Sequence, residues 1–342
     1  MEAVHALKRA REVPPSTSSN ASVVAGLSFP LQMTQLNNAL AGKKFERFSF
    51  GLKFQLQMLA QNGFLSPTTV VAFMDVVASQ SEGISEATTI RAIRRLQGQI
   101  PFAGPNTEAV ELSLKTLSDL LVQSQHAVAR ESTSSSAYIV QPEHICDIYK
   151  ATVTPTGIYL YGPEPEIKNR ILRKHNDHTS YFLQVSFLDE NGEPIRYERN
   201  TSNDSIFLGR FQKILEGNIN IAGRGYEFLG FSHSSLRAQT CYFMAPFAQG
   251  PQLLHSRAVI AGLGDFSLIR SPAKCAARSK WQYKAARLST APLNLMTSFE
   301  MTDLGISCLL LFLSSLRISA LRHFFLQGAL LGAKFWQTPH PP

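Results

Sequence analysis

The chain has 342 residues, 44% of them hydrophobic and 17% charged, and this composition indicates a mostly folded, soluble protein of two or three domains. Its 33 Lys and Arg exceed its 25 Asp and Glu, and the formal charge of +8 favours anionic partners such as nucleic acid or an acidic membrane surface. A scaffold of zinc knuckles or paired redox thiols is excluded because the four cysteines are far apart, at Cys146, Cys241, Cys275 and Cys308.

Residues 1–30 are predicted to form a flexible arm. The stretch from 12 to 22 is rich in Ser and Pro and poor in apolar side chains, so it cannot offset the entropy lost on ordering. The N-terminus contains no apolar core of the length that a secretory signal requires. We therefore expect the protein in the cytosol or the nucleus.

Residues 31–130 are predicted to form a helical domain. An amphipathic stretch runs from Phe48 to Gly63, and Ser66 followed by proline is typical of the start of a second helix. The third and fourth helices are expected at 86–96 and after Asn106, where Val110, Leu114, Leu117 and Leu121 share one face and are explained by core packing.

A Ser-rich linker is predicted at 131–137, where helical periodicity gives way to the alternating pattern of β-strands. The region from 138 to 290 is predicted to be mixed and mainly β. Its expected elements are strands at 157–161 and 181–188, a hairpin turn at Asn191-Gly192, a helix from Asp204 to Leu215 that ends at Gly217, two strands joined at Ala222–Gly225, and a strand from Cys241.

Four blocks of this region, taken in order, resemble a known family. They are VTPTGIYLYGPEPEIKNRILR at 153–173, YFLQVSFLDENGEP at 181–194, GNINIAGRGYEFLGFSHSSLRAQTCYFMAP at 217–246 and GLGDFSLIRSPAKCAAR at 262–278. The chain is thereby similar to fungal and other eukaryotic cell-encoded RNA-dependent RNA polymerases over about 48–278. Three positions depart from the family pattern: Gln184 replaces a usual Arg, Ser235 a usual Gln, and Tyr242 a common Trp.

The resemblance implies an α+β fold, with the helical domain followed by the start of a double-psi β-barrel region. It also implies an RNA-directed RNA polymerase, a nucleotidyltransferase that copies single-stranded RNA from nucleoside triphosphates for RNA silencing, with silencing-pathway proteins as further partners. Such an enzyme uses Mg²⁺, which the family holds with an Asp-x-Asp-Gly-Asp loop. No two of the eight aspartates here are separated by one residue, so we expect no catalytic residue in this chain and no activity from it alone.

Basic residues are the candidate RNA contacts. Between 257 and 287 seven positive side chains accompany Asp265 as the only acid, a pattern typical either of phosphate binding or of a merely solvated basic face. No metal site is expected, although His175 and His178 have the spacing of paired ligands. The candidate RNA-binding residues are Arg224, Arg237, Arg270, Lys274 and Arg278.

The segment 291–342 is an apolar tail unlike the family, and we interpret the last 64 residues, after Arg278, as the product of a shifted reading frame or a retained intron. Its stretch LGISCLLLFLSSL, from Leu304, is too short to span a bilayer, so a membrane anchor is not expected. The alternative to a truncated polymerase is a non-catalytic module that binds RNA or a partner protein.

Overall fold

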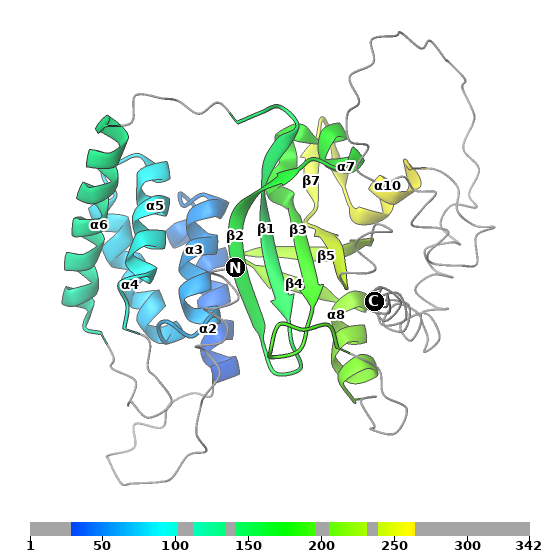
Figure 1. Cartoon of the computed structure of the whole chain (residues 1–342), viewed down its shortest axis with the longest axis horizontal. Coiled ribbons are helices and arrows are strands. Elements are labelled where there is room, and N and C mark those ends of the chain that lie inside the picture. The colour runs from blue at the N-terminus through cyan, green and yellow to red at the C-terminus, as the bar shows by residue number, and fades with distance from the viewer. Residues whose placement is uncertain (1–28, 102–111, 135–140, 196–204, 231–238, 264–342) are drawn as a thin grey trace, which may run out of the picture.

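The computed structural model describes residues 29–101, 112–134, 141–195, 205–230 and 239–263. In these residues a group of helices lies beside a curled, mixed β-sheet, so the class is α+β as predicted (Figure 1). The predicted arm at 1–30 and the tail at 291–342 lie almost wholly outside the described residues.

The helical part agrees with the local signals in the sequence. The side chains of Ser49, Ser66 and Ser85 each accept a backbone N–H of the first helical turn that follows, and the chain leaves α3 through Gly63 at a φ of 77°. The sequence predicts the third of these helices at nearly its observed bounds. The helices are α2 (Phe29–Ala41), α3 (Phe50–Gln61), α4 (Pro67–Gln80), α5 (Glu86–Gln97) and α6 (Leu114–Ser134), with a short turn η1 (Lys43–Phe45) after α2.

The observed end of α6 differs from the predicted start of the linker. The helix continues to Ser134, so the first four residues of the segment 131–137 are helical, because tertiary packing extends a helix beyond the point where Ser lowers its propensity. Leu117 and Leu121 are buried as predicted, whereas Leu114 is 41% exposed. Val110 lies outside the described residues, and α2 was not predicted as a separate helix.

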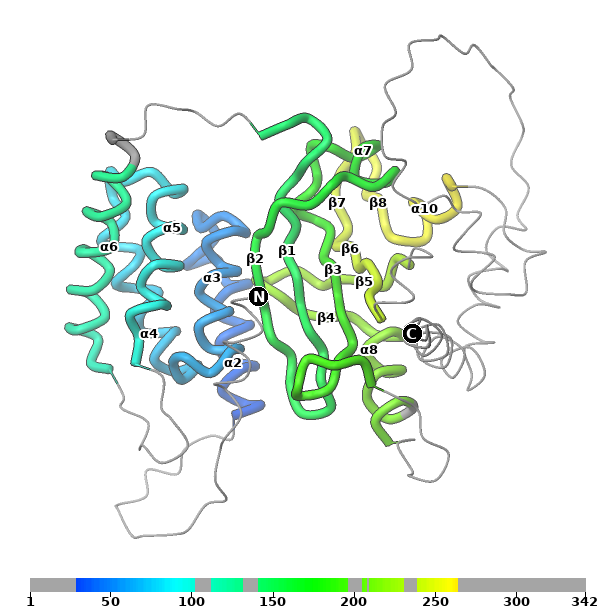
Figure 2. The backbone as a smooth tube through the Cα atoms, viewed as in Figure 1, coloured from blue at the N-terminus to red at the C-terminus, as the bar shows by residue number. Residues whose placement is uncertain are grey.

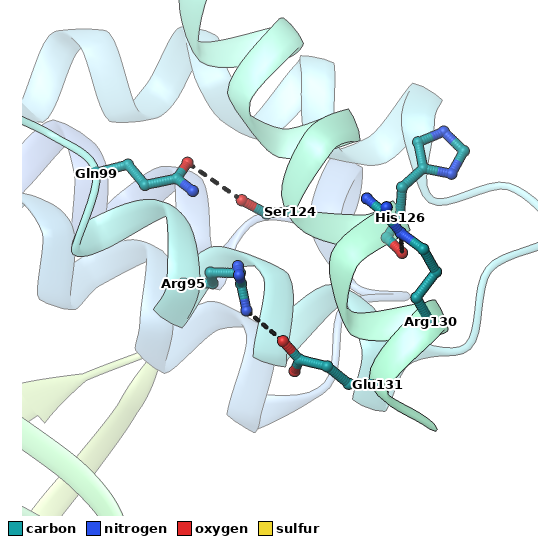
Figure 3. Close-up of polar contacts among 6 residues, drawn as sticks. All are labelled: Arg95, Gln99, Ser124, His126, Arg130 and Glu131. Atoms are coloured by element: carbon teal, nitrogen blue, oxygen red, sulfur yellow. Dashed lines mark hydrogen bonds and ion pairs between the residues drawn. The ribbon is translucent and has the colours of Figure 1, made fainter. Parts of the chain in front are cut away.

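Helices α5 and α6 are joined by polar side chains (Figure 3). The guanidinium of Arg95 forms an ion pair with Glu131, and the hydroxyl of Ser124 donates a hydrogen bond of 3.5 Å to the amide oxygen of Gln99. Glu131 therefore takes part in a helix–helix contact in the segment that the sequence assigned to a linker.

The six-stranded sheet has the order β2-β1-β3-β6-β5-β4, and β1 pairs with β3 in parallel while the other neighbours are antiparallel (Figure 2). Strands β4 and β5 pass behind β1 and β3, so the sheet is curled (Figure 1). Its strands are β1 (Ile145–Val153), β2 (Ile158–Ile167), β3 (Phe182–Phe187), β4 (Asn218–Ile221), β5 (Arg224–Gly230) and β6 (Thr240–Met244).

The predicted turns are present. Gly192 has a φ of 77°, and its N–H donates to the carbonyl of Asp189 at 3.1 Å. Ala222 and Gly223 both have positive φ, at 53° and 77°, as a two-residue hairpin turn requires, so this turn is tighter than the predicted 222–225. A Cβ on Gly223 would also lie 3.2 Å from the Cα of Ala41 in α2, so a glycine is needed here for space as well.

The predicted strand at 157–161 is the first half of the longer β2, and the strand at 181–188 is β3. Strand β1 was missed. The predicted helix ending at Gly217 is observed as a π-helix, η3 (Ser205–Phe211), followed by the α-helix α8 (Gln212–Glu216). Asp204 lies outside the described residues.

Alternate residues of the sheet enter two different cores. Val185, Phe187 and Phe243 face the concave side, where they pack against α3 and the segment η3–α8. Phe182 and Met244 face the other side, which is covered by small elements. These are α7 (Arg170–Lys174), η2 (Asn176–Tyr181), β7 (Phe247–Gln249), β8 (Gln252–Leu254) and α10 (Ser256–Ala261).

Helix α3 bonds to both edges of the sheet. Asn62, directly after α3, donates to the carbonyl and accepts the N–H of Leu160 in β2, both at 2.8 Å. Gln57 accepts the N–H of Ala222 at 2.6 Å and donates to the carbonyl of Asn220 in β4 at 3.5 Å. Because β2 and β4 are opposite ends of the strand order, α3 closes the open side of the curled sheet.

The apolar side chains of α3 belong to two cores. Phe54 and Met58 pack in the concave core of the sheet, whereas Leu52, Leu56 and Leu59 pack among the other helices. The predicted helical and β regions therefore share one buried helix. None of the helices within the described residues has the length and apolarity to cross a membrane.

We expect the replacement Asn62→Ala to expose the edge of β2, because it removes the only side chain that the structure shows bonding to both polar backbone atoms of Leu160. The free energy of unfolding should fall by about 1 to 3 kcal/mol. Hydrogen exchange of the Leu160 amide should accelerate selectively. The neighbouring replacement Gln61→Ala is the control, and equal exchange at Leu160 in both variants would contradict the edge contact.

Candidate nucleic-acid interface

Arg224, the first residue of β5, lies between two aromatic rings. Its guanidinium carbon is 4.2 Å from the ring centroid of Phe50 in α3 and 3.9 Å from that of Tyr181 before β3. One guanidinium nitrogen donates to the carbonyl of Ser180 at 3.1 Å, and the hydroxyl of Tyr226 donates to the same oxygen at 3.2 Å. The cation therefore joins α3 to the start of two strands.

No carboxylate of the described residues forms an ion pair with Arg224. Burial lowers the pKa of Lys53, and the positive charge of Arg224 lowers it further against the opposing effect of Glu46. Burial raises the pKa of the Tyr149 hydroxyl, while the charge of Arg224 acts in the opposite direction. The charge of Arg224 therefore acts on both neighbouring groups.

A second aromatic group surrounds Phe247 in β7. The ring of His178 lies 4.4 Å from that of Phe247, and the rings of His175 and Tyr181 lie 5.4 Å and 5.5 Å from it. The Nε2 atom of His178 is 3.0 Å from the carbonyl oxygen of Ala248. His175 is buried, and burial, followed by the charges of Lys174 and His178, lowers its pKa. The two histidines pack against an aromatic ring.

Basic side chains also gather where α7 and α10 meet, and the sequence analysis missed most of them. Arg170, Arg173 and Lys174 in α7 and Arg257 in α10 are exposed. The Nζ atom of Lys174 is 3.5 Å from the position that a Cβ would take on Gly262, just after α10. A basic run in residues 168–174 was the available signal, but the sequence did not show that α10 lies beside it.

The acidic pairs Glu164/Glu166 and Asp189/Glu190 each bond to neighbouring groups. Lys150 Nζ lies 2.7 Å from carboxylate oxygens of both Glu164 and Glu166, and these bonds raise the pKa of Lys150 although burial opposes the shift. Glu190 accepts hydrogen bonds of 3.0 Å from the N–H and the hydroxyl of Thr156. Asp189 accepts the backbone N–H of Asn191 at 2.7 Å.

In the described part of the chain, no group of three His, Cys, Asp or Glu residues is arranged to hold a metal ion. Cys146 and Cys241 are free and buried, and burial raises the pKa of Cys146 to about 11 and that of Cys241 well above its ordinary value. Neither thiol is therefore an activated nucleophile.

Of the five candidate RNA-binding residues, the structure describes Arg224 alone. Arg237, Arg270, Lys274 and Arg278 lie outside the described residues. The guanidinium of Arg224 packs against two rings and donates to the carbonyl of Ser180. The assignment of these residues to RNA binding stays a prediction.

Residues 153–290 match the family model described as RNA dependent RNA polymerase. The chain is 33% identical to RNA-dependent RNA polymerase 1 of Arabidopsis thaliana over 145 residues. This aligned segment covers 41% of this chain and 13% of the relative. RNA-dependent RNA polymerase 2 of the same plant is 25% identical over 264 residues, which is 74% of this chain and 22% of the relative. The similarity to a probable RNA-dependent RNA polymerase 2 of rice is 31% over 149 residues, 41% of this chain and 13% of the relative.

The matched segment begins at Val153, the last residue of β1, and contains the other five strands of the sheet. This part of the chain belongs to the RNA-dependent RNA polymerase family. The chain spans between 13 and 22% of the length of these relatives.

Replacing Arg224 with Ala should lower the free energy of unfolding by about 1 to 3 kcal/mol, because two ring contacts and one hydrogen bond are lost. Urea unfolding of the full chain measures the change. Arg224→Lys should recover only part of the loss, since an ammonium group lacks the planar surface that stacks on both rings. The exposed control Arg91→Ala should change stability by less than about 0.5 kcal/mol. A loss no larger than the control would show that Arg224 does not join α3 to the sheet.

Proposed function

We propose that this protein serves RNA-templated RNA synthesis of the kind used in RNA silencing, with single-stranded RNA as template and nucleoside triphosphates as substrates. The match of residues 153–290 to the polymerase family carries this proposal. Further support comes from the plant relatives, each named as a known or probable RNA-dependent RNA polymerase. We also propose silencing-pathway proteins as partners and the cytoplasm or the nucleus as location.

In this proposal the curled sheet forms the start of a double-psi β-barrel region. Its curvature and its buried concave face, which includes Val153, Val185 and Phe243, are consistent with that architecture. Helix α3 would then pack against this barrel and bond to its edge strands.

Nucleotidyl transfer needs metal ions held by clustered carboxylates, and Mg²⁺ is the ion we propose for the family reaction. The residues present here do not fit such a site. The eight aspartates include no pair separated by one residue, and Asp189, Glu164, Glu166 and Glu190 are bonded to neighbouring groups. No catalytic step is therefore assigned to these residues.

What this chain contributes under the proposal is a folded, basic surface for RNA. Arg224 is stacked between rings and lacks a carboxylate partner among the described residues, and the candidates Arg237, Arg270, Lys274 and Arg278 extend the positive charge along the sequence. A surface of this kind binds phosphates independently of sequence and with strong dependence on salt.

The purified chain should bind single-stranded RNA but incorporate no labelled nucleotide on that template with Mg²⁺, because the carboxylates are absent. Filter binding and primer-independent incorporation measure the two properties. Incorporation above that of a template-free control would mean that catalytic carboxylates have been overlooked. Absence of RNA binding at low salt would contradict the proposed role of the chain.

A chimaera tests membership of the polymerase core directly. Residues 153–263 should replace the corresponding segment of Arabidopsis RNA-dependent RNA polymerase 1 with retention of measurable RNA-templated synthesis, since they lie within the segment that matches the polymerase family model. The control is the same chimaera with one aspartate of its metal loop changed to Asn, which should be inactive. A chimaera that melts cooperatively like the parent but synthesises no RNA would contradict the proposal.

A further inference from the structure

Four exposed cations lie on the surface formed by two short helices, and we call them the α7–α10 basic face: Arg170, Arg173, Lys174 and Arg257. Three come from α7 and one from α10, elements that are far apart in the sequence. Figure 2 shows α7 and α10 at the same end of the sheet, together with β7 and β8.

The apolar side chains of the two helices belong to one buried cluster. Ile171 and Leu172 of α7 are buried in the same cluster as Val259 of α10 and Phe247 of β7. Asn169 fixes the start of α7, because its side chain accepts the N–H groups of Ile171 and Leu172 at 2.9 Å. The cations therefore project from an ordered base.

Glu227 of β5 fixes the start of α10. Its carboxylate lies 3.0 Å from Nδ1 of His255 and accepts the hydroxyl proton of Ser256 at 2.9 Å. Burial raises the pKa of Glu227, but the bonds to His255 and Ser256 outweigh it and lower the pKa. Glu227 is therefore a carboxylate at the start of α10. The Glu227 carboxylate is bonded to His255 and Ser256 and does not form an ion pair with Arg257.

The positive charge of the face is not neutralised by the described residues. None of their carboxylates lies within ion-pair distance of Arg170, Arg173, Lys174 or Arg257. Asp177 is the one acid between positions 168 and 178, and it is exposed. Arg173 donates to the carbonyl of Lys168 at 2.9 Å, which leaves the other three side chains available.

The sequence continues the positive charge beyond α10. After Gly262, Asp265 is the only acid up to Arg287, while Arg270, Lys274, Arg278, Lys280 and Lys284 follow. A long run of cations with one acid matches a polyanion whose charges repeat along a chain better than it matches a single phosphate.

We propose that the α7–α10 basic face binds the phosphodiester backbone of single-stranded RNA. This inference rests on the proposed function, which supplies a single-stranded template, and it adds a contact surface formed by residues outside the sequence-based candidates. Binding through phosphates positions the strand without reading its bases. The affinity should therefore depend on salt and little on sequence.

The test compares two triple variants of the full chain with the same change in net charge. R170Q/K174Q/R257Q removes three cations of the face and leaves Arg173 in its backbone contact. R91Q/R94Q/K115Q removes three exposed cations from α5 and α6. The probe is a fluorescein-labelled oligouridylate of about 15 nucleotides, long enough to cover an ssRNA site of about 4 to 16 nucleotides, and fluorescence anisotropy gives the dissociation constant at several KCl concentrations.

For R170Q/K174Q/R257Q we expect weaker binding at every salt concentration. The slope of log K against log salt should decrease in magnitude by about 2, since each lost phosphate contact removes roughly 0.7 on a single strand. R91Q/R94Q/K115Q should keep the wild-type slope. R170K/K174R/R257K keeps the three charges and should bind like the wild type, which separates loss of charge from loss of fold.

Equal losses in the two neutralised variants would show that binding follows net charge, and wild-type binding by R170Q/K174Q/R257Q would show that the face is not used. Either result overturns this inference and leaves the proposed function standing. A wild-type chain that binds no RNA at low salt would overturn both. Binding to vesicles with 20% phosphatidylserine in place of RNA would identify the face as a membrane contact and overturn the inference.

Discussion

The hydrogen bonds from α3 to both edges of one sheet determine how this protein is arranged. A curled sheet of six strands has two edges, each with unpaired backbone groups that would otherwise face water or another chain. The amide of Asn62 bonds to β2, and that of Gln57 bonds to the β4–β5 turn. One helix thereby covers both edges and shields the concave core with Phe54 and Met58.

The same helix forms part of the surroundings of Arg224, a candidate RNA contact. Phe50, at the start of α3, provides one of the two rings that enclose Arg224, and Lys53 on the same helix shares its electrostatic environment. Because an aromatic face attracts a cation without a counter-ion, the site can keep its positive charge at little cost. Arg224 therefore contributes to the packing of α3 against the sheet.

Similarity to the polymerase family and the placement of acidic side chains are separate features of this chain. The strands after β1 lie in the segment that matches the polymerase family, whereas several carboxylates of the described residues, among them Glu164, Glu190 and Asp189, are engaged in ion pairs and turns. Fold and reaction separate in this way because a sheet is held by apolar burial, whereas phosphoryl chemistry requires a few acidic side chains at one place.

The sequence by itself determined the features that depend on neighbours along the chain. The helix start at Ser66, the exit at Gly63, and the turns that contain Gly192 and Gly223 follow from side-chain capping and from glycines that accept positive φ. The family resemblance also came from sequence, through ordered blocks that the family match at 153–290 confirms.

Only the tertiary structure decided the features that depend on contacts between distant residues. Strand β1, with Asp147 and Lys150 among its residues, lacks a clear strand pattern and is formed by pairing with β2 and β3. The role of α3 between two sheet edges and the approach of α7 to α10 were equally invisible in the sequence. Capping and turn preferences act over a few residues, whereas edge covering and charge clustering depend on which distant segments pack together, and buried apolar side chains such as Leu172 and Val259 determine that packing.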